Sequence, residues 1–205
     1  RLAHMLAVAG ESAAPLAALL ADRDPLRGAG ADLGTRLAAL KSTKRDPGLS
    51  RIRDEAKRLA RQAPPTRISD PSAQAALAYP DRIGLRRPGD EPRWLLSGGK
   101  GVKLDASDAL AGQRLLVVTD TDGHPTEATV RTGLPIAESL LRGVLHESIE
   151  RVTFATWSKR DGKVVAQNEE RLGAIALSSK RGDDAPEEDL AAAMLEGVRQ
   201  LGLHH

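Results

Sequence analysis

The chain has 205 residues, which is enough for one large domain or two small ones around a real hydrophobic core. Hydrophobic residues make up 40% and charged residues 28%, as is usual for soluble proteins. The net charge is +2 and there is no cysteine, which excludes a disulfide framework, cysteine-based zinc sites and thiol catalysis. No apolar run reaches the ~18 residues that span a membrane, and no signal peptide is found, so we expect a cytoplasmic protein.

The two ends of the chain indicate a fragment. It begins with Arg1, and the residues that follow already have the pattern of a helix inside a protein. We therefore expect an excised piece whose first helical region is incomplete. His204 and His205 are either native or part of a tag, and we assign them no role.

The first part of the chain is predicted to be helical. Apolar residues recur at helical spacing over residues 2–9, 12–20, 33–40, 49–62 and 71–78. Gly10 ends the first helix and Ser12 is placed to cap the second, while Asp70 followed by Pro71 starts the fifth. Residues 46–48, Asp-Pro-Gly, are predicted to form a turn.

From residue 79 onward the pattern changes to short strands. Strands are predicted over residues 93–97, 101–104, 115–119, 127–131, 149–158, 163–171 and 172–178. The clearest hairpin turns at Asp161-Gly162, and residues 136–145 form an inserted helix. The last helix, residues 186–201, is expected to turn Leu190, Met194, Leu195, Val198 and Leu201 inward. We predict an α+β fold, with a helical domain over residues 1–78 and a small β-barrel with inserted and C-terminal helices over residues 79–205.

Charge is distributed unevenly along this chain. Bases dominate residues 36–67, whereas residues 183–196 are acidic. A basic block favours an anionic partner such as nucleic acid, but a solvated helix face explains it equally well. The segment that joins the two predicted domains, residues 79–104, is also basic and glycine-rich. Aromatic residues are only 2% of the chain, so bases have few side chains on which to stack, and contacts with nucleic acid would go to phosphates.

Three motifs resemble catalytic sites. Asp120 and Asp122 have the spacing of a phosphatase motif, but the chain returns at once as a strand, which favours a hairpin turn. RDEAKRL at residues 53–59 resembles a Walker B motif but lies in a helix, where Asp54 and Arg58 have the spacing of a surface ion pair. SGGKGV at residues 97–102 lacks P-loop spacing and reads either as a plain turn or as a turn whose N–H groups and Lys100 meet a phosphate. We predict no catalytic and no metal site.

Several stretches together resemble one family. They are RLAHMLAVAG, AALLADRDPLRG, DLGTRLAAL and RIRDEAKRLAR in the helical part, AYPDRIGLRRPGDEPRWLLSGGKGVKL at the junction, and ERLGAIALSSK and GVRQLGL near the end. This set resembles the region that follows the two motor domains in HrpB-type helicases of the DEAH-box group. The resemblance implies a helicase-associated helical domain and an oligonucleotide-binding (OB)-like barrel. Because the chain has no Walker A or Walker B motif in context, it should not hydrolyse ATP itself.

The resemblance also implies a role and partners. The chain would be the non-catalytic C-terminal accessory region of an ATP-dependent RNA helicase, whose RecA-like motor domains bind ATP and Mg²⁺. It would line a channel for single-stranded nucleic acid, and the candidate phosphate contacts are Arg51, Lys57, Arg58, Arg61, Arg82, Arg86, Arg87, Lys100 and Lys103. The alternative is a protein-interaction module that docks on the motor domains or on another protein without touching nucleic acid.

Overall fold

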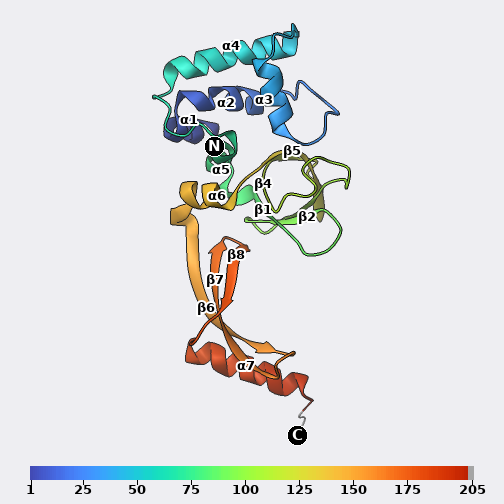
Figure 1. The fold of residues 1–205 in the computed structure, drawn as a ribbon, viewed down its shortest axis with the longest axis vertical. Coiled ribbons are helices and arrows are strands. Elements are labelled where there is room, and N and C mark those ends of the chain that lie inside the picture. Colours follow the sequence, from blue (N-terminus) through green and yellow to red (C-terminus); the bar gives the residue numbers. More distant parts are fainter. Residues whose placement is uncertain (203–205) are drawn as a thin grey trace. The chain divides into compact units, whose positions relative to one another are not determined.

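The computed structural model describes residues 1–202, which form two compact units (Figure 1). Unit 1 comprises residues 1–146, and unit 2 begins at residue 147. The α+β class predicted from the sequence is confirmed, because helices precede a closed barrel, a second sheet and a last helix. No helix within the described residues is long and apolar enough to cross a membrane.

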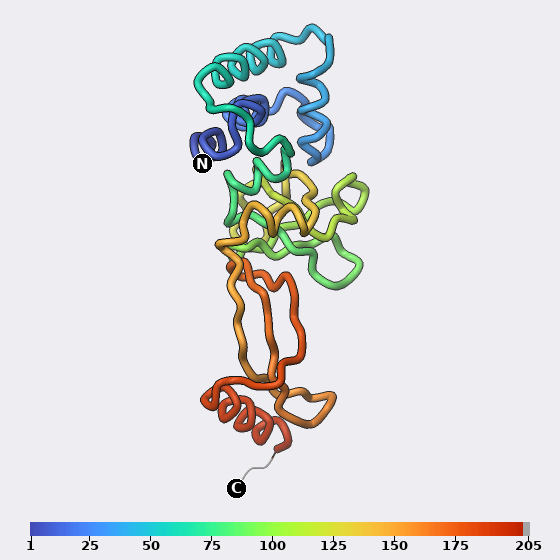
Figure 2. Tube along the Cα trace, turned by 60° about the vertical axis from the view of Figure 1, so that its left-hand side comes forward, coloured from blue at the N-terminus to red at the C-terminus, as the bar shows by residue number. Residues whose placement is uncertain are grey.

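Unit 1 opens with five helices. They are α1 (Leu2–Ala9), α2 (Ala14–Ala21), α3 (Leu33–Lys41), α4 (Pro47–Gln62) and α5 (Pro71–Ala78), and a 3₁₀ turn (Glu11–Ala13) lies between the first two. Gly10 ends α1 as predicted, with φ at 91° and no room for a Cβ, which would lie 2.3 Å from the Pro65 carbonyl oxygen. The helices pack through buried alanine and leucine side chains and gather on one side of the barrel (Figure 2).

The caps of these helices differ in part from the prediction. Asp70 accepts hydrogen bonds from the N–H groups of Ser72 and Ala73, so it caps α5 as expected. Ser12 does not cap α2; its hydroxyl donates to the Ile68 carbonyl and so ties the start of α2 to the chain before α5. Asp46 caps α4, which therefore begins at Pro47 where a turn was predicted.

A closed five-stranded barrel follows α5 in unit 1. Its strands are β1 (Ile83–Arg86), β2 (Arg93–Leu96), β3 (Gly101–Lys103), β4 (Leu115–Thr121) and β5 (Glu127–Pro135), in the order β1-β2-β3-β5-β4. Pairing of β1 with β4 closes the barrel, and β3 with β5 is the parallel pair. Trp94 is fully buried in the barrel core, and its indole N–H donates to the Gln113 carbonyl. A short helix, α6 (Glu138–Val144), ends unit 1.

The helices and the barrel belong to the same compact unit. The boundary predicted between residues 78 and 79 therefore lies inside unit 1, where α5 contacts β4 and β5 and the 22–32 loop is bound to β5. The division into domains 1–78 and 79–205 stays a prediction. β1, which was not predicted, has only four residues, too few to show an alternating pattern.

Unit 2 contains an antiparallel sheet and one helix. The sheet consists of β6 (Ile149–Ser158), β7 (Lys163–Leu172) and β8 (Ile175–Arg181), and the helix is α7 (Glu187–Gln200). The predicted hairpin is confirmed, since Ser158 pairs with Lys163 across the turn at Asp161-Gly162. His204 and His205 lie outside the described residues.

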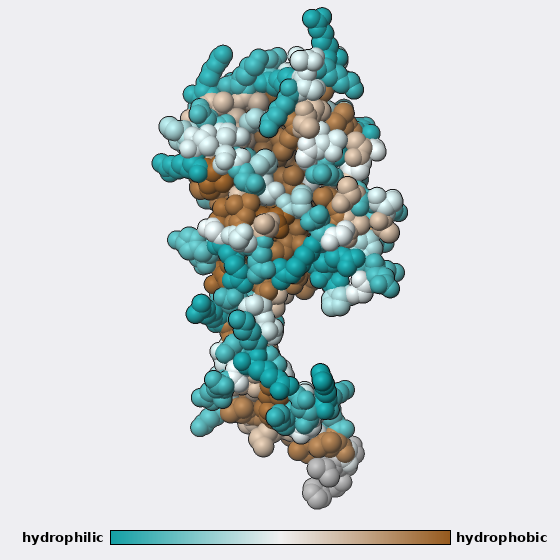
Figure 3. Space-filling model, in the orientation of Figure 1, coloured by the Kyte–Doolittle hydropathy of each residue, from teal (hydrophilic) through white to brown (hydrophobic). Residues whose placement is uncertain are grey.

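The inward face predicted for α7 is wrong. Met194 is 62% exposed and Leu201 64%, and Leu195 and Val198 are also exposed. Small residues, Ala193 and Gly197, are the buried positions instead, because the helix lies close against the ring of Trp157. The large apolar side chains therefore flank the contact, and hydrophobic surface remains open on this unit (Figure 3).

The close approach of α7 to Trp157 gives a test of unit 2. A Cβ at residue 197 would lie 2.4 Å from the Trp157 ring, so Gly197→Ala must shift the helix or the ring. We expect it to lower the free energy of unfolding by about 1–3 kcal/mol. Gly143→Ala in α6 is the matched control, because a Cβ there meets open space and alanine favours a helix by ~1 kcal/mol. Urea denaturation of both variants measures this, and equal stability would contradict the packing described.

Candidate nucleic-acid interface

The basic helix α4 carries four of the predicted phosphate contacts, and three of them have partners. Arg51 forms a bidentate pair with Asp22, at 2.8 and 2.9 Å. Arg58 binds Glu55, and Lys57 lies 3.8 Å from Asp54, so the predicted pairing of Asp54 with Arg58 is wrong. The helix brings residues three apart together here instead of four apart. Arg61 is exposed and has no side-chain partner in the described chain.

Another arginine of α4, Arg53, is half-buried and bound to the neighbouring helix. Arg53 donates hydrogen bonds to four carbonyl oxygens, those of Ala39, Leu40, Ser42 and Lys44. The carbonyls of Ala39 and Leu40 lie in the last turn of α3, where backbone oxygens have no partner within the helix, and the other two follow the helix end. Arg53 therefore caps α3, and the basic block is partly structural.

The arginines of the junction are also engaged. Arg82 donates to the Thr119 carbonyl at 2.8 Å, and its guanidinium lies 5.0 Å from the centre of the Tyr79 ring. Arg86 donates to the Ala111 carbonyl at 3.2 Å and lies near the carbonyls of residues 89 and 90. Acidic side chains of the junction pair elsewhere, Asp81 with Arg1 and Glu91 with Arg93.

The glycine-rich turn between β2 and β3 is a structural turn. The N–H groups of Ser97, Gly98 and Gly99 donate to backbone carbonyls at 2.7–2.8 Å, so none is available for a phosphate. Lys100 is exposed without a side-chain partner in the described chain, as is Arg87. Lys103 lies 3.9 Å from Glu127. The Lys100 ammonium is therefore the group of this turn that we expect an anion to contact.

The basic residue Arg36 is buried and forms part of the wall of a large cavity. It is 1% exposed and pairs with Asp24 through two hydrogen bonds, at 2.7 and 3.1 Å. It also donates to the carbonyls of Leu26, Gly30 and Asp32, so it is bonded to the 22–32 loop at several points along its length. The Arg36 guanidinium holds the pKa of Asp24 below its usual value.

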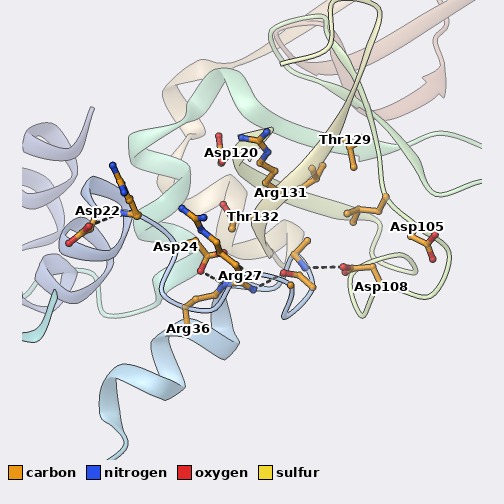
Figure 4. A pocket seen from close by; sticks show the side chains of 16 residues that line it. Asp22, Asp24, Arg27, Arg36, Asp105, Asp108, Asp120, Thr129, Arg131 and Thr132 are labelled. Atoms are coloured by element: carbon orange, nitrogen blue, oxygen red, sulfur yellow. Dashed lines mark hydrogen bonds and ion pairs between the residues drawn. The ribbon is translucent and has the colours of Figure 1, made fainter. Parts of the chain in front are cut away.

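The 22–32 loop and the barrel enclose two adjoining cavities in unit 1. The larger, of about 800 Å³, lies between this loop, β5 and the segment after β3, and is called here the loop–barrel groove (Figure 4). The smaller, of about 420 Å³, continues past Arg82 and Tyr79. The loop is fixed to the barrel, because Gly133 donates to the Ala31 carbonyl and Ala31 donates to Asp108, both at 2.9 Å.

The loop–barrel groove brings together arginines that the sequence analysis did not select. The guanidinium groups of Arg23, Arg27 and Arg131 line it, and none has a hydrogen-bond or ion-pair partner among residues 1–202. In Figure 4 the Arg27 side chain reaches out from the loop, and the Arg131 side chain lies beside Asp120. They come from segments about 100 residues apart, so no sequence spacing marked them.

The two aspartates of the motif at residues 117–123 have different surroundings. Asp122 accepts hydrogen bonds from the N–H groups of His124 and Thr129, at 3.1 and 2.9 Å. These bonds fix the β4–β5 turn and lower the pKa of the Asp122 carboxyl group. Asp120 instead lines the groove. Within residues 1–202 no group of three or more histidine, aspartate or glutamate side chains could hold a metal ion. The hairpin reading of this motif is therefore supported.

Comparisons with known proteins link the chain to one helicase. No protein-family model matches it. The curated ATP-dependent RNA helicase HrpB of Escherichia coli K12 is 28% identical over 211 residues. The chain is similar to HrpB over 99% of its own length. The resemblance to HrpB-type helicases predicted from the sequence is thereby confirmed.

Solved structures of HrpB agree with this likeness. A crystal structure described as the E. coli DExH-box NTPase HrpB matches with a TM-score of 0.72 at 27% identity. Another, described as the E. coli DEAH/RHA helicase HrpB, matches with a TM-score of 0.71 at 25% identity. Each match covers 99% of this chain and 25% of that of HrpB. The chain thus spans about a quarter of the length of the helicase it resembles.

The buried pair of Arg36 and Asp24 provides a test of the groove wall. Arg36→Met leaves Asp24 and three carbonyls without their donor, and we expect a loss of about 2–4 kcal/mol in the free energy of unfolding at pH 7. Arg45→Met, at an exposed position without a side-chain partner in the described chain, is the control and should change stability by no more than ~0.5 kcal/mol.

The loss of unfolding free energy caused by Arg36→Met should depend on pH. Because pairing lowers the pKa of folded Asp24, its stabilising contribution is complete well above the unfolded value of ~3.9 and is lost as pH falls through the lower folded value. Urea denaturation at pH 7 and near pH 3 is the measurement. The difference in the free energy of unfolding between wild type and Arg36→Met should become smaller at the acidic pH. An equal difference at both pH values would argue against the ion pair.

Proposed function

We propose that the chain is a non-catalytic accessory region of an ATP-dependent RNA helicase, from the C-terminal part of that protein, and that it lines a channel for single-stranded RNA. The observation that carries this proposal is the similarity to HrpB, in sequence and in fold, over 99% of the chain. ATP and Mg²⁺ would be bound by RecA-like motor domains, which lie outside this chain. Its own contribution would be to bind phosphates while the motor moves the strand.

The proposed phosphate contacts are those named from the sequence, and their surroundings support them unequally. Arg61, Arg87 and Lys100 are exposed without side-chain partners in the described chain, so binding a phosphate breaks no existing bond. Arg51, Arg58 and Arg82 would have to exchange hydrogen bonds that they already make. Surface ion pairs contribute ~0–1 kcal/mol each, so the exchange costs little, but it reduces the free energy gained from each phosphate contact.

Salt dependence tests the proposal. Affinity of the chain for a fluorescent single-stranded RNA, measured by anisotropy, should fall roughly tenfold or more between 50 and 200 mM salt if a few phosphates are neutralised. The sequence of the RNA should matter little, because phosphate contacts carry no base information. Absent binding, or affinity that does not change with salt, would refute the proposed channel role.

A second function, docking on the motor domains without nucleic-acid contact, is favoured by the open apolar surface of α7. Met194, Val198 and Leu201 border a cavity of about 410 Å³ beside Trp157, lined almost entirely by apolar side chains. Exposed apolar patches of this kind mark protein contacts. The occupant we propose is the motor region, since the chain spans only a quarter of the helicase it resembles.

Calorimetry with separately prepared motor domains of a HrpB-type helicase tests docking. We expect Met194→Gln with Val198→Gln to weaken the association by at least tenfold, because two apolar side chains would lose their buried contacts. Ala191→Gln, an exposed position of the same helix that does not line the cavity, is the control and should have little effect. Equal affinity of all three proteins would contradict the docking function.

A further inference from the structure

The loop–barrel groove contains three arginines whose donors are unused. Arg23 and Arg27 lie on the 22–32 loop and Arg131 lies on β5, and the walls that carry them are joined by hydrogen bonds between Ala31, Gly133 and Asp108. Each guanidinium offers a planar fork of donors that matches a phosphate. These donors make no hydrogen bond within the described chain. An anion that enters the groove can therefore accept hydrogen bonds from them without breaking existing ones.

In the described chain the acidic side chains of the groove form no hydrogen bond with the guanidinium groups of these three arginines, although Asp22 and Asp24 attract Arg23 and Arg27 electrostatically. Asp22 is bound by Arg51 and Asp24 by Arg36. Asp108 accepts from the N–H groups of Ala31 and Leu110, and Asp105 accepts from Ser107. Within the described chain only Asp120 among the lining carboxylates lacks such a partner. Asp105, Asp108 and Asp120 therefore keep negative charges that no ion pair within residues 1–202 neutralises, against the three positive charges of Arg23, Arg27 and Arg131.

We propose that the loop–barrel groove is the main nucleic-acid site of this chain, and that Arg23, Arg27 and Arg131 bind the phosphates of one single strand. This inference rests on the proposed function, and it assigns most of the phosphate contacts to the groove instead of α4. The volume of about 800 Å³ suits a few nucleotides of one strand, and it is far too small for a duplex. The backbone that carries the arginines is already fixed, so binding has to order only their side chains.

The decisive experiment compares two triple variants of the whole chain. The groove variant carries Arg23→Gln, Arg27→Gln and Arg131→Gln. The matched control carries Lys41→Gln, Arg45→Gln and Arg67→Gln, which removes the same charge from exposed side chains that have no partner in the described chain, do not line the groove and are not among the proposed phosphate contacts. Affinity for a single-stranded RNA is measured from 50 to 200 mM salt. Circular dichroism and thermal unfolding confirm that both variants remain folded.

We expect the groove variant to lose most of the salt dependence. Three phosphate contacts on a single strand correspond to a fall of ~20-fold in affinity over this salt range, and the groove variant should lack it while the control keeps it. Equal losses in both variants would mean that only net charge matters and would overturn the inference. Loss in the control alone would do so too, while leaving the proposed function intact. No binding by the wild-type chain would refute both.

A second pair of variants tests the site without removing an arginine. Asp120→Asn removes the one unpartnered carboxylate of the groove and should tighten RNA binding by about two- to fivefold, because a charge that repels phosphates is gone. Asp122→Asn is the control; it lies in the neighbouring turn, outside the groove lining, and should leave the affinity unchanged. Unchanged or weaker binding by Asp120→Asn would count against phosphates in the groove.

Discussion

The buried contact of Arg36 with Asp24 is the constraint on which the candidate site depends. A guanidinium with 1% exposure must satisfy its donors inside the protein, and here it does so with a carboxylate and three carbonyls of one loop. The loop would otherwise be a long irregular connection without a core of its own. Once held, it closes against β5 and becomes one wall of the loop–barrel groove.

Arginines of the same chain thus have two physical roles. Some, like Arg36 and Arg53, satisfy backbone oxygens that would be costly to leave unpaired. Others, like Arg27 and Arg131, project from a fixed scaffold with all their donors open. Net charge counts both kinds equally, which is why a basic block is a weak guide to a binding surface. Hydrogen-bond partners separate them, and this separation supports the groove over α4.

The scarcity of aromatic residues shapes both units. Trp94 is packed in the barrel core, and α7 packs through Gly197 on the ring of Trp157. Both tryptophans therefore have structural roles. Tyr79 lies under the guanidinium of Arg82 at the edge of the smaller cavity. With so few rings available, recognition of a strand by stacked bases is disfavoured, and phosphates remain the part of a nucleic acid that this chain is equipped to bind.

The sequence by itself determined the helical first part, the later strands, the hairpin at Asp161-Gly162 and the likeness to HrpB-type helicases, because periodicity, turn residues and motif order are local properties. It did not determine which arginines have guanidinium donors without a hydrogen-bond partner in the folded chain. That depends on contacts such as Arg53 with α3, or Arg131 of β5 facing the 22–32 loop, which join residues distant in the chain. The exposed face of α7 has the same origin. Helical spacing identifies an apolar stripe, but only the packing of Gly197 on Trp157 decided which side of the helix is covered.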